Sequence, residues 1–438
     1  MRSIKSGNLY IKKRTFPEWL MFLIFFTPFT LAFFTELIGG MGFVKFIIDV
    51  SLIVALAILI TKSISQSKGL YAVSRDVLPF LILVCVFLVY TFIVYLCNYE
   101  SPFYYLWGVR NNFRFYLAFF VFIAFLCEEE VLRFFEILDF LFWVHVVICF
   151  IQFFFFDIEQ DYLGGIFGAQ KGCNGYLIVF MSVIVTRSIL RFMNGTENTF
   201  NCFMKCGASL LVAALAELKF YFFLFIFILV LSAIFTSFSF RKVIIIVAGS
   251  IFLMIAYTIL VAFFDMFDGF LSFEYLWNSI TRTNYASKDD MGRLTAIPTI
   301  SRLFLTTPAQ QLFGMGLGNC DTSTIDIFNT EFYVNYVDLH YSVFSISFLF
   351  LETGAFGLIM YTLFFILCFA FTFKKFKKNM GNRFFNQMAM IISILSVIMM
   401  VYNSSLRTEA GYMYFFILAL PFIESGRAGV DNLKKSNI

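Results

Sequence analysis

The sequence predicts an all-α integral membrane protein of about twelve transmembrane helices. Hydrophobic residues make up 61% of the 438 residues and charged residues only 14%, whereas a soluble domain carries about 25% charged residues. Phenylalanine alone accounts for 66 residues, a content that would cause aggregation in water but suits helix packing and lipid contact in a bilayer. Nothing in the composition separates off a soluble domain, so we expect a single membrane domain over residues 1–438.

Apolar runs along the chain predict the individual spans. A bilayer core about 30 Å thick is crossed by roughly 20 helical residues. The first run has no small-residue cleavage site, so we expect it to be an uncleaved first helix. The runs that reach or nearly reach the required length lie near residues 17–38, 43–61, 77–97, 106–127, 134–156, 174–192, 204–217, 219–238, 243–264, 340–373, 386–402 and 409–423.

The distribution of positive charge orients these spans. If the N-terminus is cytoplasmic, 22 of the 32 Lys and Arg residues fall in inner segments, as the positive-inside rule expects. A missed span would scramble this bias further along the chain, and the bias persists to the C-terminus. We therefore expect both termini to be cytoplasmic.

One outer segment is much longer than the others. Residues 265–339 separate the ninth and tenth runs, and loops of this length are usually functional. Its basic residues are concentrated in one part. We count Arg293 among the candidate catalytic residues, and Arg282 and Arg302 among the candidate substrate-binding residues. The run Gly314-Met315-Gly316-Leu317-Gly318 faces outward, away from cytoplasmic nucleotides, so we interpret it as a tight turn.

Basic residues in other outer segments form a second group of candidates. Arg110 and Arg114 are spaced i, i+4 at the outer end of the fourth run and therefore share one helix face. Guanidinium groups bind phosphate oxygens bidentately and stay charged in a partly dry site, so this pair, with Arg293 and Lys219, could hold a lipid pyrophosphate. The alternative for the two arginines is snorkelling to ordinary lipid phosphates, and Lys219 and Glu217 could neutralise each other.

The chain contains two histidines. His145 lies in the middle of the fifth run, where we expect a packed, hydrogen-bonded residue. His340 ends the long outer loop, and a histidine can exchange a proton near neutral pH, so it is the candidate catalytic base. The alternative is an interfacial histidine at a helix start that Asp338 or Ser342 caps.

Glu352 is a carboxylate inside the tenth run, and an intramembrane carboxylate is a functional candidate by default. We include it among the candidate substrate-binding residues, with the alternative that it satisfies loosened backbone beside Gly354. The run over residues 340–373 is too long for one perpendicular span, so it must tilt, break near Gly354 or Gly357, or project outward.

The nine cysteines are scattered, without a CxxC pair or a nearby histidine, which argues against a metal site. Cys173 and Cys320 fall in predicted outer loops and could form a disulfide, although nothing in the sequence requires it.

Several short motifs, taken in order, suggest a family. They are Gly292-Arg293-Leu294, then Leu312-Phe313-Gly314-Met315-Gly316-Leu317-Gly318, then His340, then Leu351-Glu352-Thr353-Gly354-Ala355-Phe356-Gly357-Leu358. With the twelve-span plan and the large loop before the tenth span, the whole chain resembles the O-antigen polymerase/O-antigen ligase superfamily. The resemblance implies a GT-C-like fold and a metal-independent glycosyltransferase that uses undecaprenyl-diphosphate-linked glycans at the periplasmic face of the bacterial inner membrane.

The resemblance also implies residue roles. The loop histidine of the family corresponds to His340, its loop arginine to Arg293, and the basic residue between its seventh and eighth helices, commonly arginine, to Lys219. Tyr341 follows His340 where the family commonly has asparagine, which weakens a ligase assignment. We expect His340 to activate the acceptor hydroxyl while Arg293, Lys219 and the two arginines of the fourth run hold the pyrophosphate, without a metal or cofactor.

The expected function is therefore that of an O-antigen or surface-polysaccharide polymerase. Its expected partners are an undecaprenyl-diphosphate-linked oligosaccharide, the lipid bilayer and a candidate regulator of chain length, with no nucleic acid. The alternatives are a ligase that transfers the glycan to lipid A core, a cell-wall glycosyltransferase of the shape, elongation and division family, and a flippase for the lipid-linked sugar. Mid-span polar residues are essentially limited to His145 and Glu352, which favours surface chemistry over passage.

Overall fold

The computed structural model describes residues 15–38, 42–65, 76–98, 101–263, 291–321, 323 and 328–435. Every regular element in these ranges is helical. The long helices are α1 (Phe16–Phe26), α2 (Phe46–Ser65), α3 (Leu78–Asn98), α4 (Pro102–Phe125), α5 (Glu128–Phe156), α6 (Asn174–Met193), α7 (Thr199–Leu215), α8 (Lys219–Phe235), α9 (Phe240–Phe263), α14 (Ser345–Lys377), α15 (Arg383–Tyr402) and α16 (Gly411–Lys435). Three short helices, α11 (Ala296–Leu303), α12 (Pro308–Phe313) and α13 (Glu331–Tyr336), precede α14.

Each predicted apolar run overlaps one of these helices, although α1 covers only the first half of the run over residues 17–38 and a 3-10 and a π-helical segment follow it there. Within the described ranges, seven of them are long and apolar enough to cross a membrane: the helix through α2, and α3, α5, α6, α9, α14 and α15. The apolar stretches of α1, α7, α8 and α16 are shorter, and α4 carries two arginines and two asparagines. The chain is therefore an α-helical multi-pass membrane protein.

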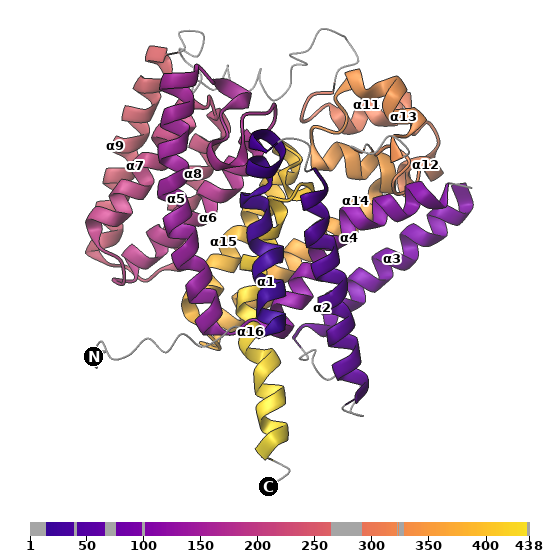
Figure 1. Cartoon of the computed structure of the whole chain (residues 1–438), viewed down its shortest axis with the longest axis horizontal. Coiled ribbons are helices and arrows are strands. Elements are labelled where there is room, and N and C mark those ends of the chain that lie inside the picture. Colours follow the sequence, from indigo (N-terminus) through magenta and orange to yellow (C-terminus); the bar gives the residue numbers. More distant parts are fainter. Residues whose placement is uncertain are drawn as a thin grey trace.

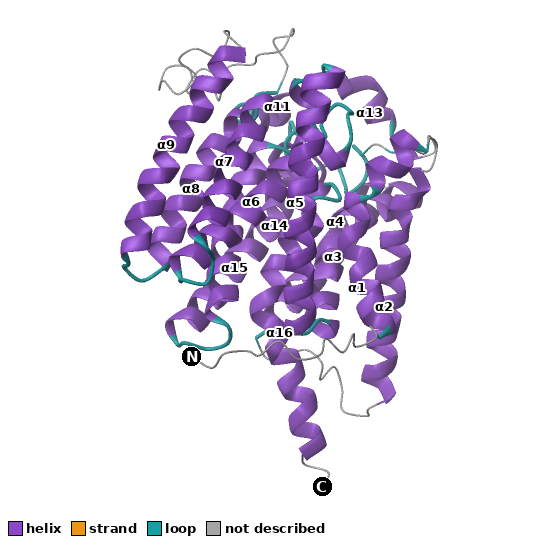
Figure 2. Ribbon diagram, turned by 60° about the vertical axis from the view of Figure 1, so that its left-hand side comes forward, coloured by secondary structure: helices purple, strands orange, loops and turns teal. Residues whose placement is uncertain are grey.

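The long helices form one bundle, and their ends gather at two opposite faces (Figures 1 and 2). The start of α1 and the end of α16 lie at the lower end of the bundle in Figure 1. Polar contacts join helix ends there: Lys375 pairs with Asp76 at 3.2 Å, and Asn382 donates to Glu128 at 2.8 Å. The segments that the charge count predicts to be inner meet at this lower end.

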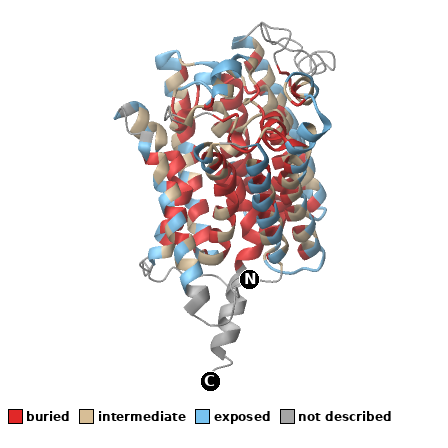
Figure 3. Ribbon diagram, turned by 90° about the vertical axis from the view of Figure 1, so that its right-hand side faces the viewer, coloured by how far each residue is buried: buried red, intermediate tan, exposed pale blue. Residues whose placement is uncertain are grey.

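The core of the bundle is rich in aromatic rings, and Figure 3 shows that the buried residues lie along the axis of the bundle. Phe364 of α14 contacts Phe80 of α3, Phe119 of α4 and Phe415 of α16, with ring centroids 5.2–5.6 Å apart. Other phenylalanines face outward, such as Phe155, which is 79% exposed. Phenylalanine therefore serves both expected purposes, internal packing and the apolar outer surface.

Helix α14 is broken at Gly354, whose φ of 61° and ψ of −167° are not helical. The predicted break near this residue is thus confirmed. The backbone of residues 314–318 lies in the break: the N–H groups of Met315 and Gly316 donate to the carbonyl oxygens of Leu351 and Glu352 at 2.9 and 2.8 Å. The Tyr90 hydroxyl donates to the Thr353 carbonyl at 2.6 Å, so a side chain of α3 satisfies another group that the break releases.

Glycines permit this close approach. A Cβ atom on Gly108 of α4 would lie 2.6 Å from the backbone nitrogen of Gly318, and one on Gly318 would collide with the Tyr104 carbonyl. The glycine-rich run was predicted to be a tight turn. The Asn319 N–H donates to the Gly316 carbonyl at 3.3 Å and the Asp321 N–H to the Gly318 carbonyl at 3.4 Å, so the run does contain turns. Its backbone is also a strip inserted between α4 and the broken α14, which anchors the segment before α14 to the bundle.

That segment has a small hydrophobic core of its own at the upper end of the bundle (Figure 1). The core joins α11 to the loop before α14 and to the first half of α14, through residues that include Met291, Ile300, Tyr341, Phe344 and Phe348. The described part of the long predicted loop is therefore folded and fixed against α14.

Candidate functional site

Two parts of the segment before α14 lie against each other and carry the two predicted catalytic residues. The Met291 N–H donates to the Leu339 carbonyl at 3.3 Å, and the guanidinium carbon of Arg293 lies 5.4 Å from the ring centre of Phe344. These contacts place the chain around Arg293 beside the chain that contains His340. The pairing could not be read from residues 47 positions apart, because it depends on how the segment folds.

His340 lies in a loop and not at a helix start. Its N–H donates to the Val337 carbonyl at 3.0 Å, and its φ of 56° closes a 3-10 turn. Helix α14 begins five residues later at Ser345, with no side-chain cap on its first turn. The alternative of a helix capped by Asp338 or Ser342 is therefore wrong, and the half-buried His340 is held by the turn before it.

Arg293 rests on aromatic rings. Its guanidinium carbon lies 4.5 Å from the ring centre of Tyr402 at the end of α15. Phe220 stacks on the same tyrosine, with centroids 3.6 Å apart and planes 8° from parallel. Lys219 begins α8 and is the residue before Phe220. The stacking of Phe220 on Tyr402 therefore brings the start of α8 to the tyrosine on which Arg293 rests.

The charge of Arg293 has no carboxylate partner among the residues that the structure describes. Its Nε–H is buried and donates to no acceptor among the described residues, although the whole side chain is only partly buried. A guanidinium held by rings keeps its N–H groups for a ligand, because an aromatic face attracts the cation without occupying its in-plane donors. Within the described part of the chain, Arg293 is thus a positioned cation whose Nε–H has no acceptor.

Arg110 and Arg114 share a helix face, as predicted, but each has an acidic partner. Arg110 donates from Nε and a terminal nitrogen to Asp49 of α2 at 3.0 and 2.6 Å. Arg114 is buried and donates to Glu409 at 2.9 Å and to the carbonyl of Arg407 at 3.2 Å. The two arginines therefore connect α4 to α2 and to the loop before α16.

Glu409 is held as an anion by this arrangement. Burial by itself would raise the pKa of this carboxyl, but the Arg114 charge and hydrogen bonds from Tyr176 and Arg114 outweigh burial and lower the pKa to about 2. The Tyr176 hydroxyl donates to the second carboxylate oxygen at 2.7 Å. The Arg114–Glu409 pair is therefore charged throughout the physiological pH range.

Arg407 extends the group of cations and was not predicted. Its guanidinium carbon lies 3.3 Å from the ring centre of Phe348, one turn beyond the Phe344 that Arg293 covers. Its contact with the Asp321 carboxylate is long at 3.9 Å, and Asn111 donates to Asp321 at 2.7 Å. The sequence signal for these residues was a charged pair, Arg407-Thr-Glu409, in the short segment before the last apolar run.

Glu352 takes the structural role that the sequence left as an alternative. It is fully buried, and its carboxylate accepts the N–H of Cys320 at 3.1 Å. Its carbonyl accepts the Gly316 N–H at 2.8 Å. Glu352 thus satisfies the backbone of the inserted strip at the break in α14.

The remaining predicted candidates lie apart from this group or outside the described residues. Arg302 is exposed on α11, and Arg282 lies outside the described residues. His145 is buried, with Cys149 Sγ 3.6 Å from its Nε2 and the Ile166 N–H donating to its Nδ1 at 3.4 Å, which confirms the prediction of a packed residue. Cys173 and Cys320 are both free thiols.

The arrangement as a whole offers an anion site at the upper end of the bundle. We call Arg110, Arg114, Arg293 and Arg407 the upper arginine group, and aromatic rings of α14 and α15 support two of its members. No group of three or more His, Cys, Asp or Glu side chains within the described ranges is arranged to hold a metal ion. No known protein-family model matches the chain, and no curated protein matches it.

Proposed function

We propose that this chain is a bacterial surface-polysaccharide polymerase of the O-antigen type. It is a metal-independent, GT-C-like glycosyltransferase of about twelve spans in the inner membrane, with both termini in the cytoplasm. It joins undecaprenyl-diphosphate-linked repeat units on the periplasmic face. The observation that carries the proposal is Arg293, a cation held on Tyr402 and Phe344 beside the loop that contains His340.

Glycan transfer needs a general base for the acceptor hydroxyl and cations that stabilise the diphosphate leaving group, and these residues can supply both. His340 accepts the proton of the acceptor hydroxyl as its oxygen forms a bond to the anomeric carbon of the donor. The bond from that carbon to the diphosphate oxygen breaks, and the polyprenyl diphosphate leaves with the electron pair. Arg293 and Lys219 hold the diphosphate and stabilise the charge that develops on it, as preorganised cations do in other transfer reactions.

Arg110 and Arg114 have a supporting role in this proposal. Because both are paired with carboxylates, which largely cancel their charge, they fix the surrounding loops and do not bind the diphosphate directly. Arg407 accepts a hydrogen bond from Arg114 through its carbonyl, and its buried Nε–H has no acceptor among the described residues. It therefore joins Arg293 as a direct phosphate ligand in the proposal.

The proposal is tested by polymerisation of a defined lipid-linked repeat with the purified protein. His340→Ala and Arg293→Ala should each lower the rate by about 100-fold or more, the effect of losing a general base or a charge-stabilising group. Arg293→Ala should also weaken retention of the donor, whereas His340→Ala should leave it unchanged. Lys171→Ala is the matched control, since Lys171 is an exposed cation that is not a member of the upper arginine group.

A His340→Ala protein that extends repeats at the normal rate would refute the catalytic assignment. Lipopolysaccharide from a deletion strain separates polymerase from ligase, because loss of a polymerase leaves a single repeat attached and loss of a ligase leaves none. Product formation in detergent, where there are no two compartments, would exclude a flippase.

A further inference from the structure

A cavity lies at the lower end of the bundle, opposite the upper arginine group, between α5, α6 and the start of α15. Its volume is about 470 Å³. Helix α5 exposes apolar side chains on its outer face, including Leu132 at 49% and Phe140 at 67%, so the cavity opens beside the surface that meets lipid. Its lining residues are Leu132, Phe135, Glu136, Asp139, Arg187, Arg191, Asn194, Thr196 and Phe384.

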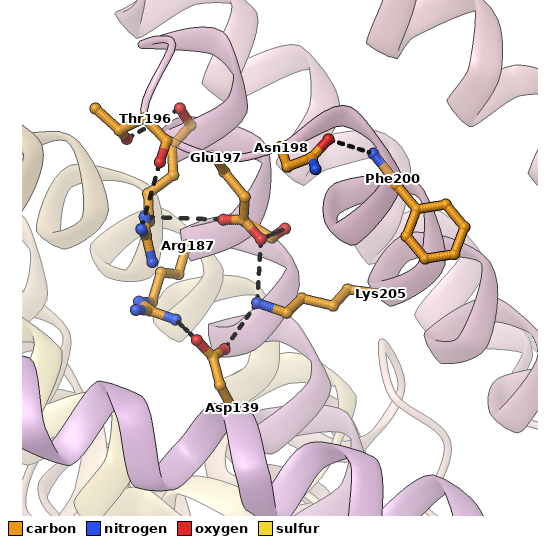
Figure 4. Close-up of polar contacts among 9 residues, drawn as sticks. Asp139, Arg187, Thr196, Glu197, Asn198, Phe200 and Lys205 are labelled. Atoms are coloured by element: carbon orange, nitrogen blue, oxygen red, sulfur yellow. Dashed lines mark hydrogen bonds and ion pairs between the residues drawn. The ribbon is translucent and has the colours of Figure 1, made fainter.

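The inner wall of this cavity is a closed network of ion pairs (Figure 4). Arg187 of α6 pairs with Asp139 of α5. Lys205 of α7 joins Asp139 at 2.9 Å to Glu197 at 3.1 Å. Arg187 and Lys205 are each only 5% exposed, so this wall has fixed, mutually neutralised charges and holds three helices together.

The mouth of the cavity is different, because its two charges are not neutralised by each other. Glu136 lies one turn before Asp139, is exposed and has no ion-pair partner among the described residues. Arg191 lies one turn after Arg187 with its side chain 33% exposed, and its closest carboxylate oxygen, on Glu197, is 3.8 Å away. The mouth therefore presents one carboxylate and one guanidinium, with Leu132 and Phe384 as apolar neighbours.

From this geometry we infer a binding site for the head group of a zwitterionic phospholipid, phosphatidylethanolamine. Its phosphate contacts Arg191, its ammonium donates hydrogen bonds to Glu136, and its acyl chains run along Leu132 and Phe384. Charge selects this head group. An anionic phosphatidylglycerol would leave Glu136 without a cation, and the trimethylammonium of phosphatidylcholine has no N–H to donate.

The inference does not depend on the proposed glycan transfer, which involves the other end of the bundle. By the positive-inside rule the lower end is cytoplasmic, so the head group would lie at the inner surface of the membrane. The site would place a lipid in the inner leaflet against α5, α6 and α15.

The test measures lipids retained by the full-length protein after delipidation and incubation with equal amounts of phosphatidylethanolamine, phosphatidylglycerol and phosphatidylcholine, detected by native mass spectrometry. Wild type should retain phosphatidylethanolamine preferentially. Glu136→Gln and Arg191→Gln should each reduce that retention about five-fold, the value of one partly exposed ion pair. Glu136 is outside the buried network, and Arg191 touches it only through the 3.8 Å contact with Glu197, so both variants should fold. Thermal unfolding of the delipidated proteins checks this.

Glu129→Gln and Arg241→Gln are the matched controls, because both residues are exposed and neither lines the cavity. They should retain as much phosphatidylethanolamine as wild type. Equal retention of phosphatidylglycerol by wild type, or a Glu136→Gln loss no larger than that of Glu129→Gln, would overturn the inference. Displacement of the lipid by free phosphoethanolamine at equal concentration would overturn it too, since the ligand would then be a soluble phosphate ester.

Discussion

The two ends of the bundle differ in how their buried cations are stabilised. At the lower end, Lys205 shares two carboxylates and Arg187 shares one of them, so the network is complete without a ligand. At the upper end, Arg114 has a dedicated partner in Glu409, whereas Arg293 and Arg407 rest mainly on rings. A shared network stabilises helix packing, while cations on rings keep donors for an anion. The upper end is therefore better suited to binding a diphosphate.

Among the changes that test this difference, the largest loss of stability should come from breaking the buried Arg114–Glu409 pair at the upper end. Glu409→Gln leaves Arg114, itself buried, without its counter-charge, and such a change typically costs about 3–5 kcal/mol. Thermal unfolding in detergent measures the loss. The double variant Arg114→Met/Glu409→Leu should recover most of it, because removing both charges also removes the unpaired one. If the double variant is as unstable as the single one, the charge pair is not the cause.

The pH dependence of the free energy of unfolding should reveal the contribution of the Arg114–Glu409 pair. The folded-state pKa of Glu409 is about 2, below its ordinary value of 4.5. A carboxyl with a pKa lowered by folding adds stability that is fully present above its unfolded pKa and is lost as pH falls through the folded pKa. Wild type should thus lose stability relative to Glu409→Gln between about pH 4.5 and pH 2, and not above about pH 5. Parallel unfolding curves for the two proteins across this range would contradict the assignment.

The next largest effect should come from displacing the inserted strip on which the upper site depends. Gly318 has a φ of 93°, and a Cβ atom there would collide with the Tyr104 carbonyl. Gly318→Ala should cost about 1–3 kcal/mol from backbone strain alone and should lower transferase activity by shifting the loop. Gly207→Ala is the matched control, because a Cβ on this helical glycine meets its nearest neighbour at an ordinary 3.8 Å. Equal stability of the two variants would show that the close approach is not needed.

The smallest effect should come from exchanging a single stacked cation. Arg407→Lys keeps the charge but loses the planar contact with Phe348, which should cost about 0.5–1 kcal/mol. Arg383→Lys provides the comparison at the lower end, because Arg383 is exposed over Phe376 at 5.1 Å and should change unfolding less. A larger loss of stability for Arg383→Lys than for Arg407→Lys would contradict the proposed difference between the two ends.

Much of this architecture follows from local sequence. Long apolar runs predicted all the long helices, because a helix is the form in which a segment satisfies its own backbone in lipid. The length of residues 340–373 predicted a break, and Gly354 is where it occurs. The i, i+4 spacing placed Arg110 and Arg114 on one face, and the mid-run position of His145 predicted a packed residue.

Only the tertiary structure decided which charges are already paired. Asp49 and Glu409 lie 61 and 295 residues from the arginines that they bind, and no local pattern links residues so far apart. The sequence therefore made Arg110 and Arg114 equal candidates with Arg293, whereas the fold gives the first two carboxylate partners and places Arg293 on rings. Helix periodicity acts over a few residues, but ion pairing depends on which helix ends meet, and that is set by the packing of the whole bundle.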